Sequence, residues 1–198
     1  MSDVFAFDET PDRVRELSLG CVQYVQRATG VVLDFSSETL PVLDYYLQGL
    51  RGEKPAVRAL LAPAAGAYFG ELVRRIFAAR WHAPREEYDR WRVEFSQCFL
   101  HFNPVAMAHE AIDGAELVEG GSGFGVNAQD LPLLKAALDT FGAISEDDYF
   151  RLATRLEALE SIVDRLLASA AQRGESKVAL GPDFYRMSLD REETERAD

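Results

Sequence analysis

The residues of this chain that could carry out chemistry are few and widely spaced. There are three histidines, His82, His101 and His109, and two cysteines, Cys21 and Cys98. Histidine and cysteine are common metal ligands, and they also serve as bases and nucleophiles in catalysis. None of the five stands in a complete motif, so each is weighed below against a structural role.

The segment His109–Asp113 begins like the metal-binding helix of a zinc protease. That motif requires a second histidine four residues after the first, where this chain has Asp113. A histidine and an aspartate one helical turn apart can ligate a metal, but a third ligand is missing. A surface helix that ends in acidic residues explains the pattern equally well. We therefore predict no metal and no cofactor.

Cys98 would need His101 or His109 as a base in order to act as a nucleophile. Reactive cysteines usually lie in electropositive, partly exposed places, whereas no Lys or Arg occurs between residues 93 and 134. We predict a structural thiol, with Cys21 and Cys98 both reduced because they lie far apart in apolar segments.

A glycine-rich segment covers residues 119–125. Ser122 in this segment lacks the glycine spacing of a nucleophile elbow, and the glycines form neither a phosphate loop nor a dinucleotide-binding motif. We predict a flexible loop, which is either a plain connector or a lid over a pocket.

Two glycines flank an aromatic pair in the helical run Gly66–Glu71. Glycine inside a helix costs about 0.5–1 kcal/mol relative to alanine, which indicates close approach by another element or a ligand. Glu71 follows directly, either as a buried acid facing a cleft or in a surface ion pair with Arg74 and Arg75. In the first case, we expect a small-molecule or catalytic cleft formed by Tyr68, Glu71, Trp81 and His101.

The formal net charge of −12 disfavours binding to nucleic acid, which depends on clustered Lys and Arg. Acidic side chains concentrate where basic ones are absent, and this region is either a solvated face or a surface that attracts a basic partner. The candidate partner-binding residues are Glu110, Asp113, Glu116 and Glu119. The N-terminus lacks the basic and apolar regions of a signal peptide, and no apolar run reaches the roughly 20 residues of a membrane helix, so we expect a cytoplasmic protein.

Apolar spacing predicts helices at Thr10–Ala28, at 38–50, from Pro55 to about Ala79, at Leu131–Thr140, and from Ser145 through Ala170. Pro63 should kink or restart its helix. The seam of the last helix, from Leu152 to Ala170, either docks on its own domain or joins two copies of the chain.

Strands are predicted at Val31–Phe35 and Trp91–Phe102, with Trp81 on a partner strand of the second. Asn103 should cap a short helix that starts at Pro104. Helices outnumber strands, so we expect an α+β fold: one mostly helical domain, residues 1–173, with a small antiparallel sheet. Residues 174–198 should form a flexible, charged C-terminal tail.

Three motifs resemble those of a group of uncharacterised bacterial cytosolic proteins: Leu33–Leu40, which is similar to "LDYS-x-ESL", Gly66–Glu71, which is similar to "GAY-x-GE", and the following Trp81. The resemblance covers residues 31–112. It implies a small bacterial α+β domain but no known reaction and no catalytic residues. Where many relatives have glycines before the tryptophan, this chain has Ala78-Ala79-Arg80.

Two functional hypotheses follow. The first is a non-enzymatic, cytosolic protein-interaction module, of the adaptor or immunity type, that binds a basic partner. The alternative is an enzyme or small-ligand-binding protein that uses the Tyr68, Glu71, Trp81 and His101 cleft.

Overall fold

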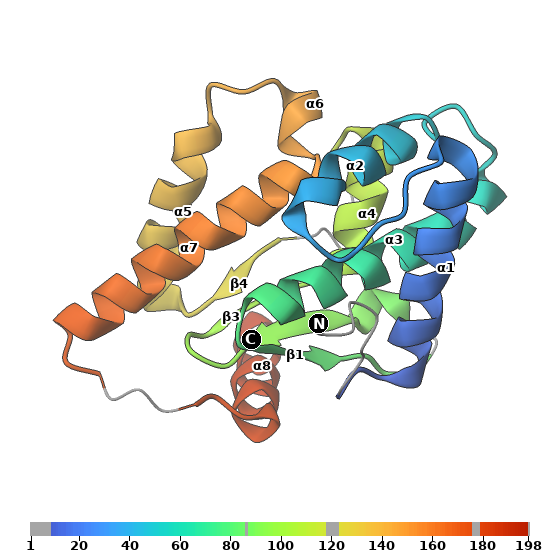
Figure 1. Cartoon of the computed structure of the whole chain (residues 1–198). Helices are drawn as coiled ribbons and strands as arrows, with labels where there is room; N and C mark the ends of the chain where they lie inside the picture. The colour runs from blue at the N-terminus through green and yellow to red at the C-terminus, as the bar shows by residue number, and fades with distance from the viewer. Residues whose placement is uncertain (1–8, 86, 118–122, 176–178, 198) are drawn as a thin grey trace, which may run out of the picture.

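The computed structural model describes residues 9–85, 87–117, 123–175 and 179–197. In these ranges, eight α-helices accompany one sheet of four strands, and each strand is antiparallel to its neighbours. Figure 1 shows most of the helices gathered above the sheet, while the C-terminal helix lies below it. The predicted α+β class, mostly helical with a small antiparallel sheet, is confirmed.

Helix α3 (Pro55–Ile76) is the centre of the fold. It packs against α1 (Asp12–Thr29) on one side and α4 (Pro104–Asp113) on the other. Its residues 61–73 are all buried, since neighbouring elements surround this stretch. The helix continues through Pro63 without restarting and ends three residues before the position predicted.

By length and composition alone, α3 could span a membrane, contrary to the sequence-based expectation. In this fold, 72% of its most apolar stretch is buried against other elements. Its hydrophobicity is thereby accounted for by its central position among α1, α4 and the sheet.

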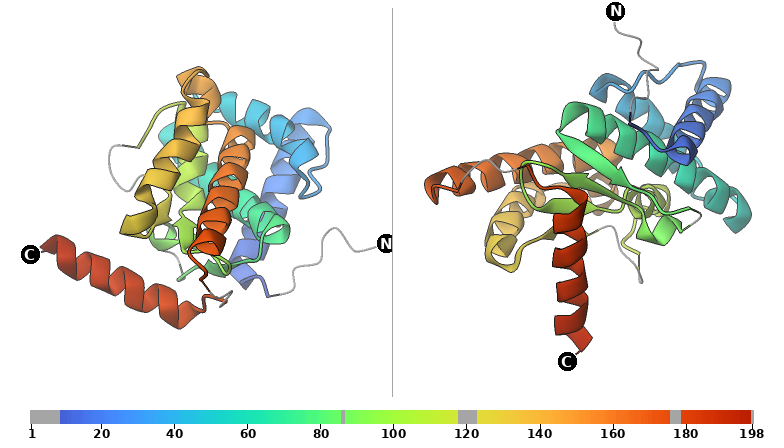
Figure 2. Two further views of the ribbon diagram at one scale, coloured as in Figure 1. Left: turned by 90° about the vertical axis from the view of Figure 1, so that its left-hand side faces the viewer. Right: turned by 90° about the horizontal axis from the view of Figure 1, so that it is seen from below.

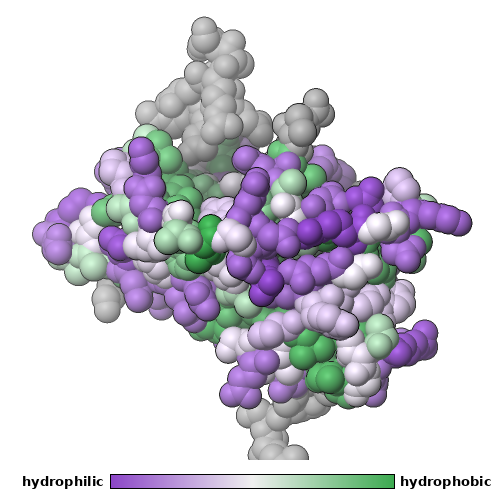
Figure 3. Space-filling model, turned by 90° about the horizontal axis from the view of Figure 1, so that it is seen from above, coloured by the Kyte–Doolittle hydropathy of each residue, from purple (hydrophilic) through white to green (hydrophobic). Residues whose placement is uncertain are grey.

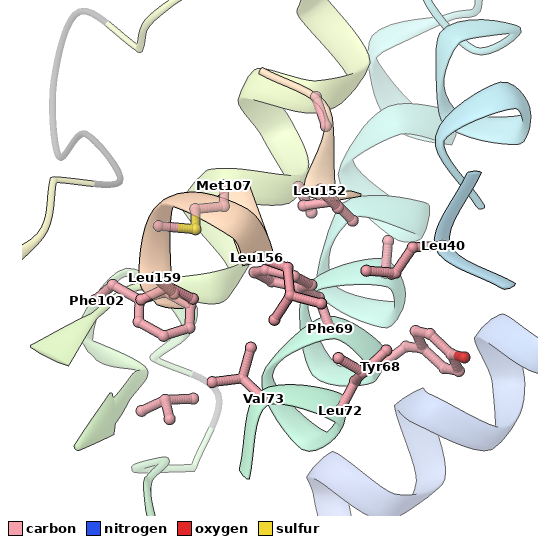
Figure 4. Close-up of a cluster of buried hydrophobic side chains, with 14 of the residues drawn as sticks. Leu40, Tyr68, Phe69, Leu72, Val73, Phe102, Met107, Leu152, Leu156 and Leu159 are labelled. Carbon is pink, nitrogen blue, oxygen red and sulfur yellow. The ribbon is translucent and has the colours of Figure 1, made fainter. Parts of the chain in front are cut away.

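Helix α7 (Leu152–Gln172) supplies the other large part of the core. Its apolar seam is buried against the same domain: Leu152, Leu156, Leu159, Val163 and Leu166 are all at most 7% exposed. Figure 4 shows Leu156 and Leu159 directed toward Phe69 of α3 and Phe102 of the sheet. The seam is therefore occupied within the chain, as the docking alternative predicted.

The sheet has the strand order β1 (Ala79–His82), β2 (Arg92–Phe95), β3 (Leu100–Phe102) and β4 (Gly125–Val126). Trp81 lies on a partner strand, as predicted, opposite Val93. Side chains alternate between two faces. The face toward α3 carries Trp81, Val93, Phe95, Leu100, Phe102 and Val126. The opposite face, which we call the outer face, carries Arg80, His82, Arg92, Glu94, His101 and Gly125.

The prediction of a single strand over Trp91–Phe102 is wrong. The segment folds into two strands joined by the turn at residues 96–99, with Val93 opposite Phe102. The turn changes the parity of the alternation, so Val93 and Phe102 share a face although a continuous strand would place them on opposite ones. Both are buried, and this common burial favours the hairpin.

The strand predicted at Val31–Phe35 is also wrong. The segment is irregular, and Val31 and Val32 are 40% and 44% exposed. Phe35 has a φ of 60°, which is incompatible with an extended strand. Its N–H donates to the hydroxyl of Tyr68 rather than to a neighbouring strand. The hydrogen bond from Phe35 to Tyr68 in α3 therefore determines the backbone here, despite the β-branched composition of the segment.

The predicted helix that starts at Ser145 is two helices. Ser145 caps only the short α6 (Glu146–Tyr149), where its hydroxyl accepts from the N–H of Asp148. The first turn of α7 is capped instead by Asp44 in α2 (Leu40–Gln48), whose carboxylate accepts from the N–H groups of Leu152 and Ala153. Asn103 caps α4 as predicted, with its side chain accepting from Val105 and Ala106.

Within the segment for which we predicted a flexible, charged tail, residues Pro182–Ala197 form the helix α8. Tyr185 of this helix is fully buried against the sheet. Figure 2 shows that the rest of α8 projects away from the body of the molecule. A single aromatic side chain at the start of the helix therefore makes its main contact with the domain.

Candidate functional site

Glu71 is a buried acid. It also forms the ion pairs with Arg74 and Arg75 that we gave as the alternative to a cleft. Its carboxylate receives two hydrogen bonds from Arg74, one from Arg75 and one from the indole N–H of Trp81. Burial raises the pKa of Glu71, but the arginine contacts outweigh burial, so the pKa lies below its ordinary value. All of these contacts are with other residues of the chain, and Glu71 does not line the pocket of about 860 Å³ described below.

Tyr68 is directed toward the irregular segment that follows α1. Its ring stacks on Phe35 with the centroids 4.5 Å apart. Its hydroxyl accepts from the Phe35 N–H at 2.9 Å and lies 3.3 Å from the Thr39 hydroxyl. Tyr68 is fully buried, and it positions the Phe35 turn rather than a ligand. The prediction that Tyr68 and Glu71 share one cleft with Trp81 and His101 is therefore wrong.

A pocket with a volume of about 860 Å³ lies on the outer face of the sheet. We call it the outer-sheet pocket. Trp81 and His101 both line it, and Arg186 and Leu189 of α8 contribute to its wall. The right-hand view of Figure 2 looks onto this side of the sheet. Of the four residues predicted to form a cleft, His101 has its side chain on this face, whereas the ring of Trp81 contacts Glu71 and Gly70 of α3 on the other face.

The floor of this pocket holds a buried carboxylate between two guanidinium groups. Glu94 is 2% exposed, and its two oxygens accept separately from the Nε of Arg80 at 3.0 Å and from the Nε of Arg92 at 2.8 Å. Arg80 also donates to the backbone oxygen of Leu180 and lies over the ring of Tyr185. The three charged side chains are therefore held in fixed positions.

His101 lies beside this triplet, directly opposite Glu94 in the sheet. Burial lowers its pKa to about 4, and the charge of Arg92 acts in the same direction. Its Nε2 is buried and has no hydrogen-bond partner among the residues that the structure describes. The imidazole covers Gly125, where any Cβ would collide with the ring. The glycine of β4 is thus needed to admit the histidine.

The glycine-rich segment reaches the same pocket. Residues 118–122, which include Glu119 and Ser122, lie outside the described residues. Gly123 and Phe124 line the pocket, and Gly125 belongs to β4 rather than to a loop. The lid and connector alternatives for residues 120–122 both stay open.

The acidic residues predicted to bind a partner do not form one surface. Glu110 is 1% exposed and its carboxylate is paired with Arg155 at 2.9 Å, so it offers no contact to a partner. Asp113 is partly buried in an ion pair with Arg58. Glu116 is exposed. The prediction is wrong for Glu110 because this residue of α4 faces the protein interior, where it pairs with Arg155.

The thiols are poorly suited to nucleophilic chemistry. Burial raises the pKa of Cys98 to about 12 and shifts the pKa of Cys21 in the same direction, so neither forms a thiolate near neutral pH. Both are free cysteines, as predicted. Within the described ranges, no group of three or more His, Cys, Asp or Glu side chains is placed to hold a metal ion.

The sequence analysis overlooked Arg80, Arg92 and Glu94. Their signal was present in the alternation of residues 79–82 and 92–95, where charged side chains occupy every second position between apolar ones. The sequence alone did not give the register of β1 against β2, which brings these positions into one patch.

No family model, curated protein or solved structure matches this chain. The resemblance to bacterial proteins with "LDYS-x-ESL" and "GAY-x-GE" motifs therefore stays a prediction. In this structure, the two motifs meet where Tyr68 binds the backbone of Phe35, so they form one packing unit.

Proposed function

We propose that this chain is a non-enzymatic ligand-binding protein and that its ligand occupies the outer-sheet pocket. The observation that supports this proposal is the pocket itself. A volume of about 860 Å³ lies within the range of roughly 300–1,000 Å³ that is typical of ligand sites. Its wall combines fixed charged groups with apolar side chains, such as Leu131 and Leu189, that a ligand can contact.

The side chains of the pocket are better suited to binding than to proton transfer. Arginine does not release its proton in proteins, and Glu94 is held between Arg80 and Arg92. His101 and His82 both have lowered pKa values, primarily because they are buried, so they are weak bases near neutral pH. What these groups supply is a rigid pattern of hydrogen-bond donors.

A protein partner is the second candidate, in keeping with an adaptor or immunity-type module. It is favoured by α8, which projects from the domain and exposes Phe184 by 42% and Met187 by 71%. These side chains lie on a different face of the helix from Leu189, which lines the pocket. The two candidates therefore use different faces of one helix. By contrast, Figure 3 shows the opposite side of the molecule, where hydrophilic side chains separate small apolar areas.

Two substitutions on α8 distinguish the candidates. Leu189→Trp fills the wall of the pocket, whereas Met187→Trp enlarges the side chain on the exposed face. A panel of neutral, anionic and cationic small molecules is screened by ¹H–¹⁵N NMR on the full chain. We expect a ligand that shifts the amides of Arg92, His101 and Gly125, and we expect Leu189→Trp alone to abolish its binding. A ligand whose shifts map elsewhere, or the absence of any ligand, would count against the proposal.

A further inference from the structure

The outer-sheet pocket has two arginines whose orientation is fixed by the same carboxylate. Arg80 and Arg92 each use Nε to bind Glu94, one on each carboxylate oxygen. Glu94 is 3% exposed, while the arginine side chains are 24% and 21% exposed. The carboxylate is therefore beneath the surface, and the guanidinium groups extend beyond it toward the pocket.

Part of each guanidinium group is left without a partner. Nη1 of Arg80 donates to the Leu180 carbonyl, but Nη2 is buried without a hydrogen bond. Within the described residues, Arg92 donates only through its Nε. Nε2 of His101, on the neighbouring strand, is likewise buried and unpartnered. A buried donor without an acceptor is costly, so these atoms favour a ligand that supplies one.

The charge of the pocket is positive although the protein as a whole carries −12. On the floor, the two positive charges of Arg80 and Arg92 exceed the single negative charge of Glu94 by one. Elsewhere in the wall, the arginines Arg90 and Arg186 are matched in number by Asp89 and Asp190. The positive field reaches the neighbouring imidazoles, since the charge of Arg92 contributes to the lowered pKa values of both His82 and His101.

We propose that the outer-sheet pocket binds the oxyanion of its ligand, a carboxylate or a phosphate group, on the free Nη nitrogens of Arg92, beside the Arg80 guanidinium and His101. This inference rests on the proposed function, because it names the ligand class of the same site. Guanidinium groups recognise both oxyanions through paired, charge-assisted hydrogen bonds. The apolar wall formed by Leu131 and Leu189 suits an anion that carries an apolar body.

Four matched probes test this inference: benzoate, phenyl phosphate, benzamide and benzylammonium. They share one ring and differ in the charged group, so they separate the carboxylate and phosphate sources from a neutral or cationic ligand. NMR titration of the full chain follows the Gly125 amide and the His101 imidazole. We expect at least one anion to bind at least tenfold more tightly than benzamide. Its negative charge should also raise the pKa of His101, which faces Arg92, Glu94 and the Tyr185 ring.

Variants connect the binding to the arginines. Arg92→Gln should weaken anion binding at least tenfold, and Arg92→Lys, which keeps the charge but loses the planar fork, should weaken it by a smaller factor. Arg27→Gln removes the same charge from an exposed site on α1 and should change the affinity less than twofold. Thermal unfolding checks that each variant is folded. If Arg92→Gln does not fold, Arg92→Lys carries the comparison.

The outcomes separate this inference from the proposed function. Equal or tighter binding of benzamide or benzylammonium at the same amides would overturn the oxyanion assignment and leave the ligand-binding proposal standing. Anion binding that is unaffected by Arg92→Gln and Arg92→Lys would also overturn it. If no probe and no other small molecule shifts the amides of the pocket, both proposals fail.

Discussion

Gly66 of α3 lies against the backbone of Val105 at the start of α4, so closely that a Cβ on Gly66 would be 2.6 Å from the Val105 Cα. Real Cβ atoms do not approach other atoms this closely, and backbone cannot move aside as a flexible side chain can. The two helices thus cross at a glycine. The second glycine of the motif, Gly70, faces the Trp81 ring in the same way. Close approach by another element was predicted, and the elements are α4 at Gly66 and β1 at Gly70.

Gly66→Ala should therefore destabilise the protein. Overpacking of this kind typically costs about 1–3 kcal/mol, which exceeds the gain of about 0.5–1 kcal/mol from helix propensity. Urea unfolding measures the difference. The control is Gly20→Ala in α1, where the added Cβ would meet only Tyr24 at 3.7 Å and should stabilise the protein. Equal effects of the two substitutions would show that the crossing is not tight.

Tyr185→Phe should loosen α8 without removing its aromatic contact. The hydroxyl accepts from the Leu100 N–H at 3.1 Å and lies within hydrogen-bond distance of three carbonyl oxygens in the β2–β3 hairpin. Leaving these buried groups unpaired should cost about 1–3 kcal/mol. Amide hydrogen exchange should accelerate in α8 and at Leu100. Tyr45→Phe, at a tyrosine that is 74% exposed, should leave exchange unchanged.

Asp44 should make stability depend on pH. Burial raises its pKa to about 6, despite the hydrogen bonds from Ala153 and Leu152. The folded protein therefore holds the proton more tightly than the unfolded chain does. The stabilisation from protonation is present near the unfolded pKa of Asp and is lost as the pH rises through about 6.

The comparison uses Asp44→Asn, which is neutral at every pH in this window. The free energy of unfolding of wild type minus that of the variant should fall by up to about 3 kcal/mol between about pH 4 and pH 7. The Asp164→Asn variant, at an exposed position of α7, should give no comparable slope. A flat difference for Asp44→Asn would show that its carboxylate titrates normally.

Glu110→Gln should be strongly destabilising, although Glu110 belongs to the acidic stretch that the sequence assigned to a partner surface. Its carboxylate pairs with Arg155, which is 6% exposed in its side chain and lies over the Tyr149 ring. Breaking a buried ion pair by removing one charge costs about 3–5 kcal/mol. Glu116→Gln, at an exposed acid six residues later, should have little effect in the same thermal unfolding assay.

The sequence by itself determined the elements whose signals are local. Helical periodicity identified α1, α3, α5 (Leu131–Leu138) and α7, and Asn103 followed by proline identified the start of α4. The α+β class followed from these patterns. Such features depend on side chains within one or two turns of the chain, so they are readable without knowledge of distant neighbours.

Only the tertiary structure decided which strands pair and which charges meet. Two strands in one apolar run became visible only through the pairing of Val93 with Phe102. The same pairing brings Glu94 beside His101, and the pairing of β1 with β2 brings Arg80 to Glu94. Whether an acid is exposed, like Glu116, or buried on an arginine, like Glu110, depends on contacts between residues far apart in the chain. The energies of burial and pairing arise only when those partners are close, and local sequence does not encode that proximity.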